Sequence, residues 1–449
     1  MPPPEAHKAA FLTLGCKLNQ SETEGIADAF RRAGFTIESA PKDADIIIVN
    51  TCAVTAKAEQ KARRLIRSLL KSHAQARIIV TGCYTFYCGR VHSGNGVQGH
   101  VSACGNDCGG VSNDNGECER LFVVSGDDKP ALLDLPEKLL TGAPLAEILS
   151  RITGAAGGGG GTAEFARAAE ATGARSEGSK KFRFNPEKNS FHSRAQLKIQ
   201  DGCDNACAYC AVTLARGPSL SIPAEEALIR LKTLEDAGAG EAVLTGVNIG
   251  LYHSPQCGGL AGLLAYLLAG TKLIALRLSS LEAAVFSDEF FELLHNPRIR
   301  PHFHLSLQSL SETILKAMGR NYHAEQIFRI IERLREVKRD PFLACDIITG
   351  FPGETQAEFE KTKTFCEQAD FAWIHAFPFS ARPGTAAFTL PGKTSAREAS
   401  SRAQTLTSLA KAGRRRYTER SIGRKVSAIF EGGSEGGGGQ QIQNCKSVG

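Results

Sequence analysis

Residues 201–210 read Asp-Gly-Cys-Asp-Asn-Ala-Cys-Ala-Tyr-Cys and bring together three cysteines, Cys203, Cys207 and Cys210. This C-x3-C-x2-C triplet offers three thiolates to a four-iron cluster and leaves the fourth iron without a protein ligand. Thiolates suit iron–sulfur clusters, and an iron with an open position can hold and activate a small molecule. A structural zinc site would normally need four protein ligands in closed geometry. The spacing therefore favours an iron–sulfur cluster with one open iron.

Six apolar stretches predict the strands of the domain that carries this motif. They are Gln196–Gln200, Ala242–Thr245, Leu273–Leu278, His302–Leu307, Phe342–Ile348 and Ala372–Phe377. Helical patterns fall between most of them, for example over Ala224–Ala237, Glu325–Val337 and Gln356–Glu367. Six strands are too few for the eight of a complete barrel, so we expect a partial, open (β/α)6 barrel over residues 188–420. The cluster loop follows the first strand, at the carboxyl-end face where barrel active sites lie.

Residues 8–142 alternate short apolar strands with helical patterns and predict an open parallel α/β sheet. The strands are expected near residues 11–14, 45–49 and 77–80, and each is followed by a cysteine, Cys16, Cys52 or Cys83. The carboxyl ends of parallel strands lie along one edge of a sheet, where such folds bind ligands. The three cysteines should therefore converge and form a second cluster site, although three buried structural thiols are the alternative.

Three other segments lack the pattern of a packed domain. Residues 85–119 are rich in glycine and asparagine and predict an insertion, although Cys88, Cys104, Cys108 and Cys118 suggest a third metal site as the alternative. Residues 143–187 include five consecutive glycines and predict a flexible linker. Residues 421–449 hold one convincing strand, too little for a complete small β-barrel.

Composition narrows the class of protein. The chain has 449 residues, 42% of them hydrophobic, and no apolar stretch approaches the roughly 20 residues of a membrane span. Its beginning lacks a secretory pattern, so we expect a cytoplasmic protein whose 14 cysteines are metal ligands and buried thiols. The net charge of +6 permits a polyanionic partner. Its basic excess gathers in residues 411–425, which alone would indicate only a solvated helix face.

With two cysteine triads in this order, the chain resembles the methylthiotransferases, which are radical S-adenosylmethionine (SAM) enzymes. The matching motifs include Thr13-Leu-Gly-Cys-Lys-Leu-Asn-Gln, Val49-Asn-Thr-Cys-Ala-Val-Thr, Val80-Thr-Gly-Cys-Tyr, His304-Leu-Ser-Leu-Gln-Ser and Asp346-Ile-Ile-Thr-Gly-Phe-Pro-Gly-Glu. Arg277-Leu-Ser-Ser-Leu-Glu282 is most similar to the branch acting on N6-threonylcarbamoyladenosine beside the tRNA anticodon. Family members usually end in a complete tRNA-binding TRAM domain, whereas residues 421–449 form only a truncated or atypical TRAM-like segment.

The resemblance implies a mechanism and its cofactors. Cys203, Cys207 and Cys210 would hold a 4Fe–4S cluster that binds SAM, and cleavage of SAM would give a radical that removes hydrogen from carbon 2 of the adenine. Cys16, Cys52 and Cys83 would hold a second 4Fe–4S cluster, from which sulfur reaches the substrate. A second SAM would supply the methyl group, and a flavodoxin or ferredoxin would supply electrons. The implied partner is the anticodon loop of tRNA, with no membrane and no stable protein partner evident.

Anchors for SAM are expected along the strand ends of the barrel, with a structural turn or cap as the alternative at each position. They are Thr245, Gly246, Asn248, Glu282, Gln308, Gly350 and Glu354, and the resemblance implies that Tyr209 packs near the adenine. Arg216 and Arg320 are further candidates for phosphate or substrate contacts, and no residue is assigned a catalytic role. The other functions left open are methylthiolation of isopentenyl-adenosine in tRNA, methylthiolation of an aspartate in a ribosomal protein, and a non-catalytic iron–sulfur redox or sensor protein.

Overall fold

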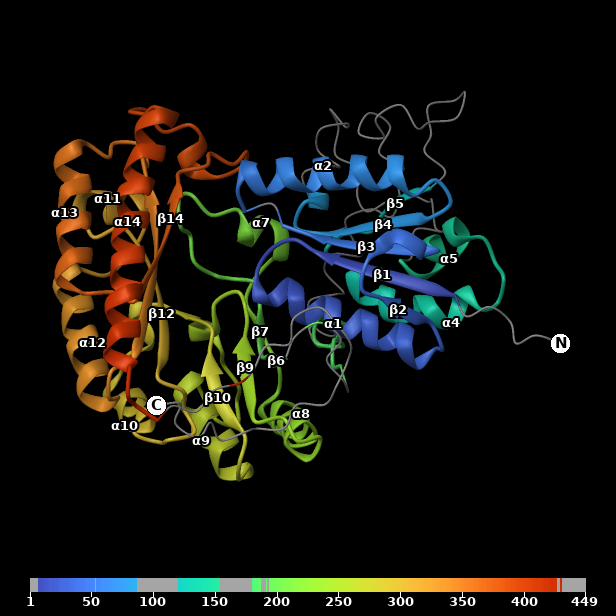
Figure 1. Ribbon diagram of the computed structural model, residues 1–449, viewed down its shortest axis with the longest axis horizontal. Coiled ribbons are helices and arrows are strands. Elements are labelled where there is room, and N and C mark those ends of the chain that lie inside the picture. The colour runs from blue at the N-terminus through green and yellow to red at the C-terminus, as the bar shows by residue number, and fades with distance from the viewer. Residues whose placement is uncertain are drawn as a thin grey trace, which may run out of the picture. The chain divides into compact units, whose positions relative to one another are not determined.

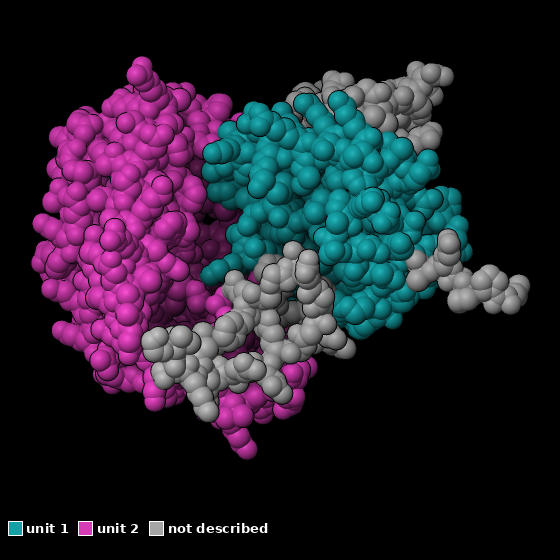
Figure 2. Space-filling model, viewed as in Figure 1, with its two compact units in different colours: residues 1–192, 214–217 teal, residues 193–213, 218–449 magenta. Residues whose placement is uncertain are grey.

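The computed structural model describes residues 7–52, 54–86, 120–153, 180–186, 191, 194–425 and 429. Its contacts divide the chain into two compact units, coloured separately in Figure 2. Unit 1 comprises Met1–His192 with Leu214–Gly217, and unit 2 comprises Ser193–Thr213 with Pro218–Gly449. The insertion with Cys88, Cys104, Cys108 and Cys118, most of the predicted linker and nearly all of the TRAM-like segment lie outside the described residues.

Unit 1 is built on one five-stranded sheet in the order β2-β1-β3-β4-β5, and every pairing is parallel (Figure 1). The strands are β1 (Lys8–Thr13), β2 (Thr36–Glu38), β3 (Ile46–Thr51), β4 (Arg77–Gly82) and β5 (Leu121–Val123). The helices are α1 (Lys17–Arg32), α2 (Ala56–Ser72), α4 (Leu135–Leu139) and α5 (Leu145–Ile152), with short 3-10 turns η1 (Pro41–Asp43) and η2 (Lys129–Leu133). The predicted open parallel sheet is confirmed.

The central strand β3 is buried on both faces, which explains its unbroken apolar run. Ile46 and Ile48 join the core formed with α1, α4 and α5. Successive strand residues point to opposite faces, so Ile47 and Val49 face the other side, where α2 lies in Figure 1. Two helical layers therefore cover the sheet and leave its carboxyl edge to the loops.

Helix α5 differs from the sequence prediction, which placed Leu145–Ile152 in a flexible linker. Its Leu145, Ile148 and Leu149 are buried in the core of unit 1. Ile148 and Leu149 follow Leu145 by three and four residues, which gives the helix one apolar face. The linker was predicted because glycine-rich sequence follows this short helix. Phe184, near the end of the same stretch, also packs into this core.

Unit 2 is the expected partial barrel, formed within the described residues by two parallel sheets. One has the order β10-β9-β6 and the other β11-β12-β13-β14. The strands are β6 (Ala195–Lys198), β9 (Glu241–Thr245), β10 (Ala275–Leu278), β11 (Ser280–Leu281), β12 (His302–Gln308), β13 (Phe342–Thr349) and β14 (Trp373–Pro378). Because β10 and β11 are nearly continuous, these strands occupy the six predicted positions.

The remaining elements of unit 2 surround and cap these strands (Figure 1). A small antiparallel pair, β7 (Gln200–Asp201) and β8 (Leu220–Ser221), brackets the cluster loop and α7 (Val212–Arg216), whose residues from Leu214 onward belong to unit 1. The other helices are α8 (Ala224–Asp236), α9 (Leu260–Gly270), α10 (Asp288–Leu294), α11 (Glu312–Met318), α12 (Ala324–Val337), α13 (Gln356–Gln368) and α14 (Ala396–Ser421). The 3-10 turns are η3 (Ile249–Leu251), η4 (Ala283–Val285) and η5 (Ala386–Phe388).

Candidate functional site

The three cysteines of unit 1 follow three neighbouring strands at one edge of its sheet. Cys16 follows β1 and caps the start of α1, Cys52 directly follows β3, and Cys83 directly follows β4. Pairing continues into these turns, since the Cys83 N–H donates to the Thr51 carbonyl at 3.0 Å. The charges of Cys16 and Cys83 both act on Cys52. The structure thus brings the triad together, as the strand pattern predicts.

Glycine is required at two of these turns. Gly15 has φ +135°, and a Cβ there would lie 2.8 Å from Cβ of Cys52. Gly82 has φ +99°, and a Cβ there would lie 2.3 Å from the Thr51 carbonyl oxygen. Both values lie in the region that only glycine adopts readily. The two glycines therefore allow the cysteine-bearing turns to approach one another closely.

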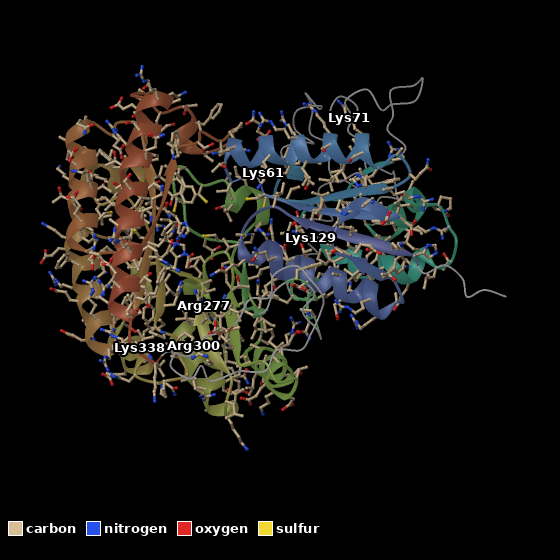
Figure 3. The ribbon with its side chains drawn as sticks, viewed as in Figure 1. Lys61, Lys71, Lys129, Arg277, Arg300 and Lys338 are labelled. Carbon is tan, nitrogen blue, oxygen red and sulfur yellow. The ribbon has the colours of Figure 1, made fainter. Side chains whose placement is uncertain are left out.

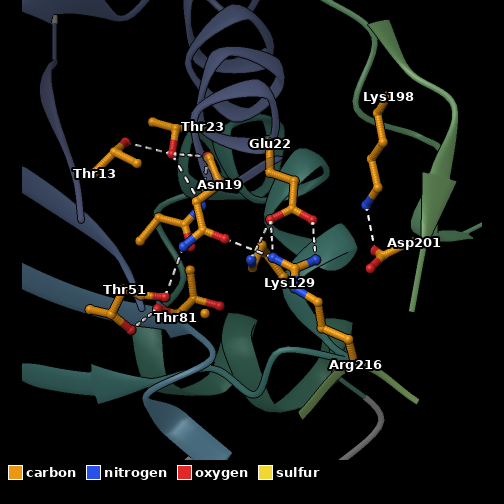
Figure 4. Close-up of polar contacts among 12 residues, drawn as sticks. Thr13, Asn19, Glu22, Thr23, Thr51, Thr81, Lys129, Lys198, Asp201 and Arg216 are labelled. Atoms are coloured by element: carbon orange, nitrogen blue, oxygen red, sulfur yellow. Dashed lines mark hydrogen bonds and ion pairs between the residues drawn. The ribbon is translucent and has the colours of Figure 1, made fainter. Parts of the chain in front are cut away.

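A polar network fixes the positions of these turns (Figure 4). Asn19 donates to the carbonyl of Thr51 at 2.9 Å and to that of Leu14 at 3.2 Å, which ties two of the turns to α1. Its Oδ1 accepts from Nη2 of Arg216 at 2.7 Å. The Arg216 side chain also pairs with buried Glu22 at 3.0 Å. The sequence predicted phosphate or substrate contacts for Arg216, whereas the structure pairs its side chain with Asn19 and Glu22. Neither of these two partners was predicted, because they are distant from Arg216 along the chain.

Two groups beside the Cys52 thiol favour its thiolate, whereas burial opposes that charged form. Burial raises the pKa of the Cys52 thiol to about 11, against a smaller lowering by the backbone N–H of Val54. Arg216 also favours the thiolate of Cys52. Thiolates are the form that binds iron, and hydrogen bonds to their sulfurs tune a cluster. Three soft ligands with a backbone donor and a nearby cation therefore fit an iron–sulfur cluster.

The triad of unit 2 lies on the loop between β7 and α7. Cys203 is buried, whereas Cys207 and Cys210 are half-buried. Burial raises the pKa of the Cys210 thiol to about 11, while the backbone N–H of Val212 lowers it. Burial also raises the pKa of Cys203, and the Asn205 N–H opposes that rise. No three His, Cys, Asp or Glu side chains in the described ranges could bind a single ion. A four-iron cluster instead binds each thiolate to a different iron.

The base of this loop is held by buried polar side chains. Lys198 Nζ lies 2.7 Å from Oδ2 of Asp201, with both side chains almost fully buried (Figure 4). The Gln200 amide donates to the Gly202 carbonyl at 2.7 Å and accepts from the Asn248 N–H at 2.9 Å. A Cβ at Gly246 would lie 2.8 Å from Gln200 Oε1. The loop is therefore joined to the end of β9, where three of the predicted SAM anchors lie.

Glu282 and Arg320 link the cluster loop to two further strand ends. Asn205 Nδ2 donates to both carboxylate oxygens of Glu282, at 3.0 and 2.8 Å. Arg320 Nη1 lies 2.5 Å from Glu282 Oε1 and 3.5 Å from Cys207 Sγ, and Nη2 donates to the Ser306 carbonyl at 2.5 Å. Glu282 thus orients the loop, and Asn205 is a residue that sequence reasoning missed.

Two buried polar atoms in this region have no hydrogen-bond partner among the described residues. They are Oγ1 of Thr245, at the end of β9, and Nε of Arg320. Buried polar groups are normally satisfied, so such atoms at strand ends favour a bound ligand. Gln308, at the end of β12, has φ +67°, which is unusual for a residue other than glycine. Backbone strain of this kind occurs mainly at functional sites.

The other predicted SAM anchors lie in different surroundings. Tyr209 packs in an apolar cluster with Met318 and Phe351, and burial raises the pKa of its hydroxyl well above its ordinary value. Glu354 faces α14 instead, where its carboxylate pairs with Arg402 at 2.7 Å and accepts from the Gly350 N–H at 2.6 Å. The contacts of Glu354 are therefore those of a buried structural ion pair.

Comparison with known proteins agrees with this arrangement. Residues 8–90 match the family described as "Uncharacterized protein family UPF0004", and residues 197–366 match the radical SAM superfamily. The chain is 36% identical to threonylcarbamoyladenosine tRNA methylthiotransferase MtaB of Treponema pallidum, over 93% of this chain and 90% of that protein. It is 32% identical to MtaB of Thermotoga maritima, over 93% of this chain and 85% of that protein.

A second group of relatives and one solved structure complete the comparison. The chain is 28% identical to tRNA-2-methylthio-N(6)-dimethylallyladenosine synthase of Jannaschia sp., over 95% of this chain and 84% of that protein. The structural match to radical SAM methyltransferase TsrM of Kitasatospora setae covers 85% of this chain and 77% of that chain, with 14% sequence identity and a TM-score of 0.51. That likeness concerns the fold alone. Among the described helices, none has the length and apolarity needed to cross a membrane.

Proposed function

The chain belongs to the methylthiotransferase family of radical SAM enzymes, and we propose that it methylthiolates carbon 2 of N6-threonylcarbamoyladenosine beside the tRNA anticodon. The observation that carries this proposal is the 36% identity to a protein named for that substrate, over almost the whole chain. Relatives named for dimethylallyladenosine match at lower identity, 28% and 29%. The substrate branch therefore follows the stronger similarity.

Membership of the radical SAM superfamily implies SAM and one 4Fe–4S cluster. Bound together, these cofactors supply the hydrogen abstraction that an unactivated aromatic carbon requires. Cys203, Cys207 and Cys210 would bind three irons of the cluster. Asn205 and Arg320 hold that loop against Glu282.

Other strand-end groups of unit 2 would position SAM. The Thr245 hydroxyl is buried and has no partner among the described residues, so it can donate to a polar group of SAM. Asn248 and the backbone at Gly246 lie beside it at the end of β9, and Gln308 lies at the end of β12. Tyr209 and Gly350 would line the adenine end. Glu354 would act indirectly, by holding the turn at Gly350.

We assign a second 4Fe–4S cluster to Cys16, Cys52 and Cys83. Support comes from their position on three adjacent strand ends, the two glycines that allow close approach and the cation of Arg216 near Cys52. Asn19 and Glu22 would hold that cation in place. Reductive cleavage of SAM at the unit 2 site would require an electron, for which we propose a flavodoxin or ferredoxin as donor.

The test is mass spectrometry of tRNA nucleosides from bacteria that lack their own methylthiotransferases and express this chain. The 2-methylthio derivative of N6-threonylcarbamoyladenosine should be formed, and a Cys203→Ala variant should not form it. Formation of the 2-methylthio isopentenyl derivative alone would move the chain to the other tRNA branch. Unmodified tRNA together with a methylthiolated ribosomal protein would overturn the proposal, and a chain that modifies neither would indicate a redox or sensor protein.

A further inference from the structure

A row of aromatic side chains, half-buried at Trp373 and exposed at His375 and Phe377, lies on the edge strand β14 of unit 2. Trp373, His375 and Phe377 alternate along the strand and therefore share one face of the sheet. The His375 and Phe377 rings are nearly parallel, at 5° with centroids 6.3 Å apart, and the Trp373 ring meets His375 edge-on. Phe377 is 42% exposed. The opposite-facing Ile374 is buried, so the row lies on the other face of β14 from that core residue.

Neighbouring strands extend this face with polar groups. Asp346 of β13 is in register with His375. The ring centroids of His304, on β12, and His375 are 5.2 Å apart. His304 Nε2 lies 3.0 Å from Oδ1 of Asp346, and its Nδ1 lies 3.1 Å from Oγ of Ser280 on β11. All four strands of the sheet thus contribute to one surface that combines ring faces with hydrogen-bonding groups.

A second stack continues the same face toward the amino ends of the strands. His302 of β12 stacks on Phe342 of β13, with centroids 5.0 Å apart and an angle of 4°. The guanidinium of Arg414 lies 5.2 Å from the Phe342 ring centroid. The Tyr417 ring packs edge-on against Phe342. Burial and Asp340 raise the pKa of the Tyr417 hydroxyl, whereas Arg414, Arg420 and Arg277 of β10, labelled in Figure 3, lower it. This end of the face therefore combines aromatic rings with several cations and one carboxylate.

The row lies close to the cluster loop of the same unit. His304 precedes Ser306 by two residues on β12, which is about 7 Å along a strand. The Ser306 carbonyl accepts from Arg320, which also contacts Cys207. A group held against the row would therefore lie within reach of the reaction that the cluster supports.

We propose that Trp373, His375 and Phe377 form a stacking surface for a nucleobase of the anticodon loop, an inference that rests on the proposed tRNA substrate. Single-stranded loops present splayed bases that stack on aromatic side chains, and every base has a face suited to such stacking. Asp346, His304, His375 and Ser280 place hydrogen-bonding groups beside the row. Such groups suit a base, which has polar edges, better than they suit an apolar side chain of a protein partner. The cations at the far end complement the phosphates of the same loop.

The chain offers a built-in probe, because Trp373 is its only tryptophan. An RNA stem–loop containing N6-threonylcarbamoyladenosine is titrated into the anaerobically reconstituted protein while the emission of Trp373 is recorded. Stacking should change the emission saturably. Phe377→Leu should weaken binding about tenfold, because loss of one base stack costs about 1–3 kcal/mol and 1.4 kcal/mol is tenfold. Phe377→Tyr should restore binding, since it keeps the ring.

Two controls separate stacking from a structural role. Phe388→Leu changes an equally exposed phenylalanine, 41% against 42%, in η5 outside the strand row, and should leave RNA affinity unchanged. The loss caused by Phe377→Leu should be the same at low and moderate salt, because stacking releases no counterions, whereas loss of a phosphate contact alters the salt slope. SAM binding by both variants reports that unit 2 is folded.

The outcomes also distinguish this inference from the proposed function. If the protein methylthiolates tRNA, but Trp373 does not respond to the RNA and Phe377→Leu binds normally, the stacking surface is wrong and the function stands. If Trp373 responds to the RNA but no tRNA is methylthiolated, the function is wrong and the surface stands. A response of Trp373 to an aspartate-bearing ribosomal peptide, and none to RNA, would overturn the assignment of the surface to a nucleobase.

Discussion

Nη1 of Arg320 donates to the sulfur of Cys207 at 3.5 Å, and the same nitrogen pairs with the carboxylate of Glu282. Its side chain is only 5% exposed, so the interaction is poorly screened by water. A positive donor beside a cluster ligand stabilises the reduced, more negative cluster. The reduction potential of a cluster is set by such hydrogen bonds and by local charge.

Arg320→Gln should therefore make the reduction potential of the unit 2 cluster more negative. We expect a change of tens of millivolts, since about 59 mV corresponds to about 1.4 kcal/mol for a one-electron couple. Anaerobic redox titration monitored by electron paramagnetic resonance measures it. Arg333→Gln, which removes an exposed arginine paired with Asp288 on another helix, is the control and should leave the potential unchanged. An equal shift in both variants would contradict a direct effect of Arg320.

Glu22 should be essential for the stability of unit 1. Its carboxylate lies 2.6 Å from Lys129 Nζ and 3.0 Å from Arg216 Nη1, and all three side chains are at most 10% exposed. Glu22→Gln would leave two buried cations without their counter-charge, which costs about 3–5 kcal/mol. Calorimetry should show a large fall in melting temperature. Glu147→Gln, which breaks an exposed pair with Arg151, should change it little.

The alkylation of Cys52 should report its burial in the cluster-free protein. Because its pKa is raised to about 11, the reactive thiolate is scarce at neutral pH and grows as the pH rises toward that value. The rate of alkylation by iodoacetamide, followed by mass spectrometry, should therefore keep rising up to about pH 11. In urea, where Cys52 is exposed to water, its rate of alkylation should level off near pH 8.5. A plateau near pH 8.5 in the folded protein would contradict the buried environment.

The basic run on α14 should divide into two roles. Arg416 and Arg420 both pair with Asp370 and hold α14 against the barrel. Arg424, just beyond the end of α14, pairs with Asp340. Arg415 is 82% exposed, and within the described residues it pairs with its helix neighbour Glu419. Arg415→Gln should flatten the salt dependence of tRNA binding by up to about 0.7–0.9 in log–log slope. Arg416→Gln should instead lower the melting temperature, and the reverse pattern would contradict this division.

The sequence predicted the features that depend on local patterns and missed the contacts between residues far apart along the chain. The convergence of Cys16, Cys52 and Cys83 was predictable because parallel strands align their carboxyl ends. The six barrel positions were predictable from apolar runs separated by helices. The pairing of Glu354 with Arg402 was not, because 48 residues separate them and no local pattern connects them. The same holds for Arg320 and Cys207, which are 113 residues apart.

The insertion, most of the linker and the TRAM-like segment remain predictions, since they lie outside the described residues. We propose different roles for the two described cysteine triads. Cys203, Cys207 and Cys210 would support the cleavage of SAM, and Cys16, Cys52 and Cys83 would support the transfer of sulfur.

The most direct test replaces Cys16, Cys52 and Cys83 with alanine and measures two products from the same anaerobic reaction with SAM, reductant and tRNA. Mass spectrometry quantifies 5′-deoxyadenosine, which reports SAM cleavage, and the 2-methylthio nucleoside, which reports sulfur transfer. We expect the variant to form 5′-deoxyadenosine but no methylthio nucleoside. Normal formation of the methylthio nucleoside by this variant would contradict a second cluster at these cysteines and would make all three structural.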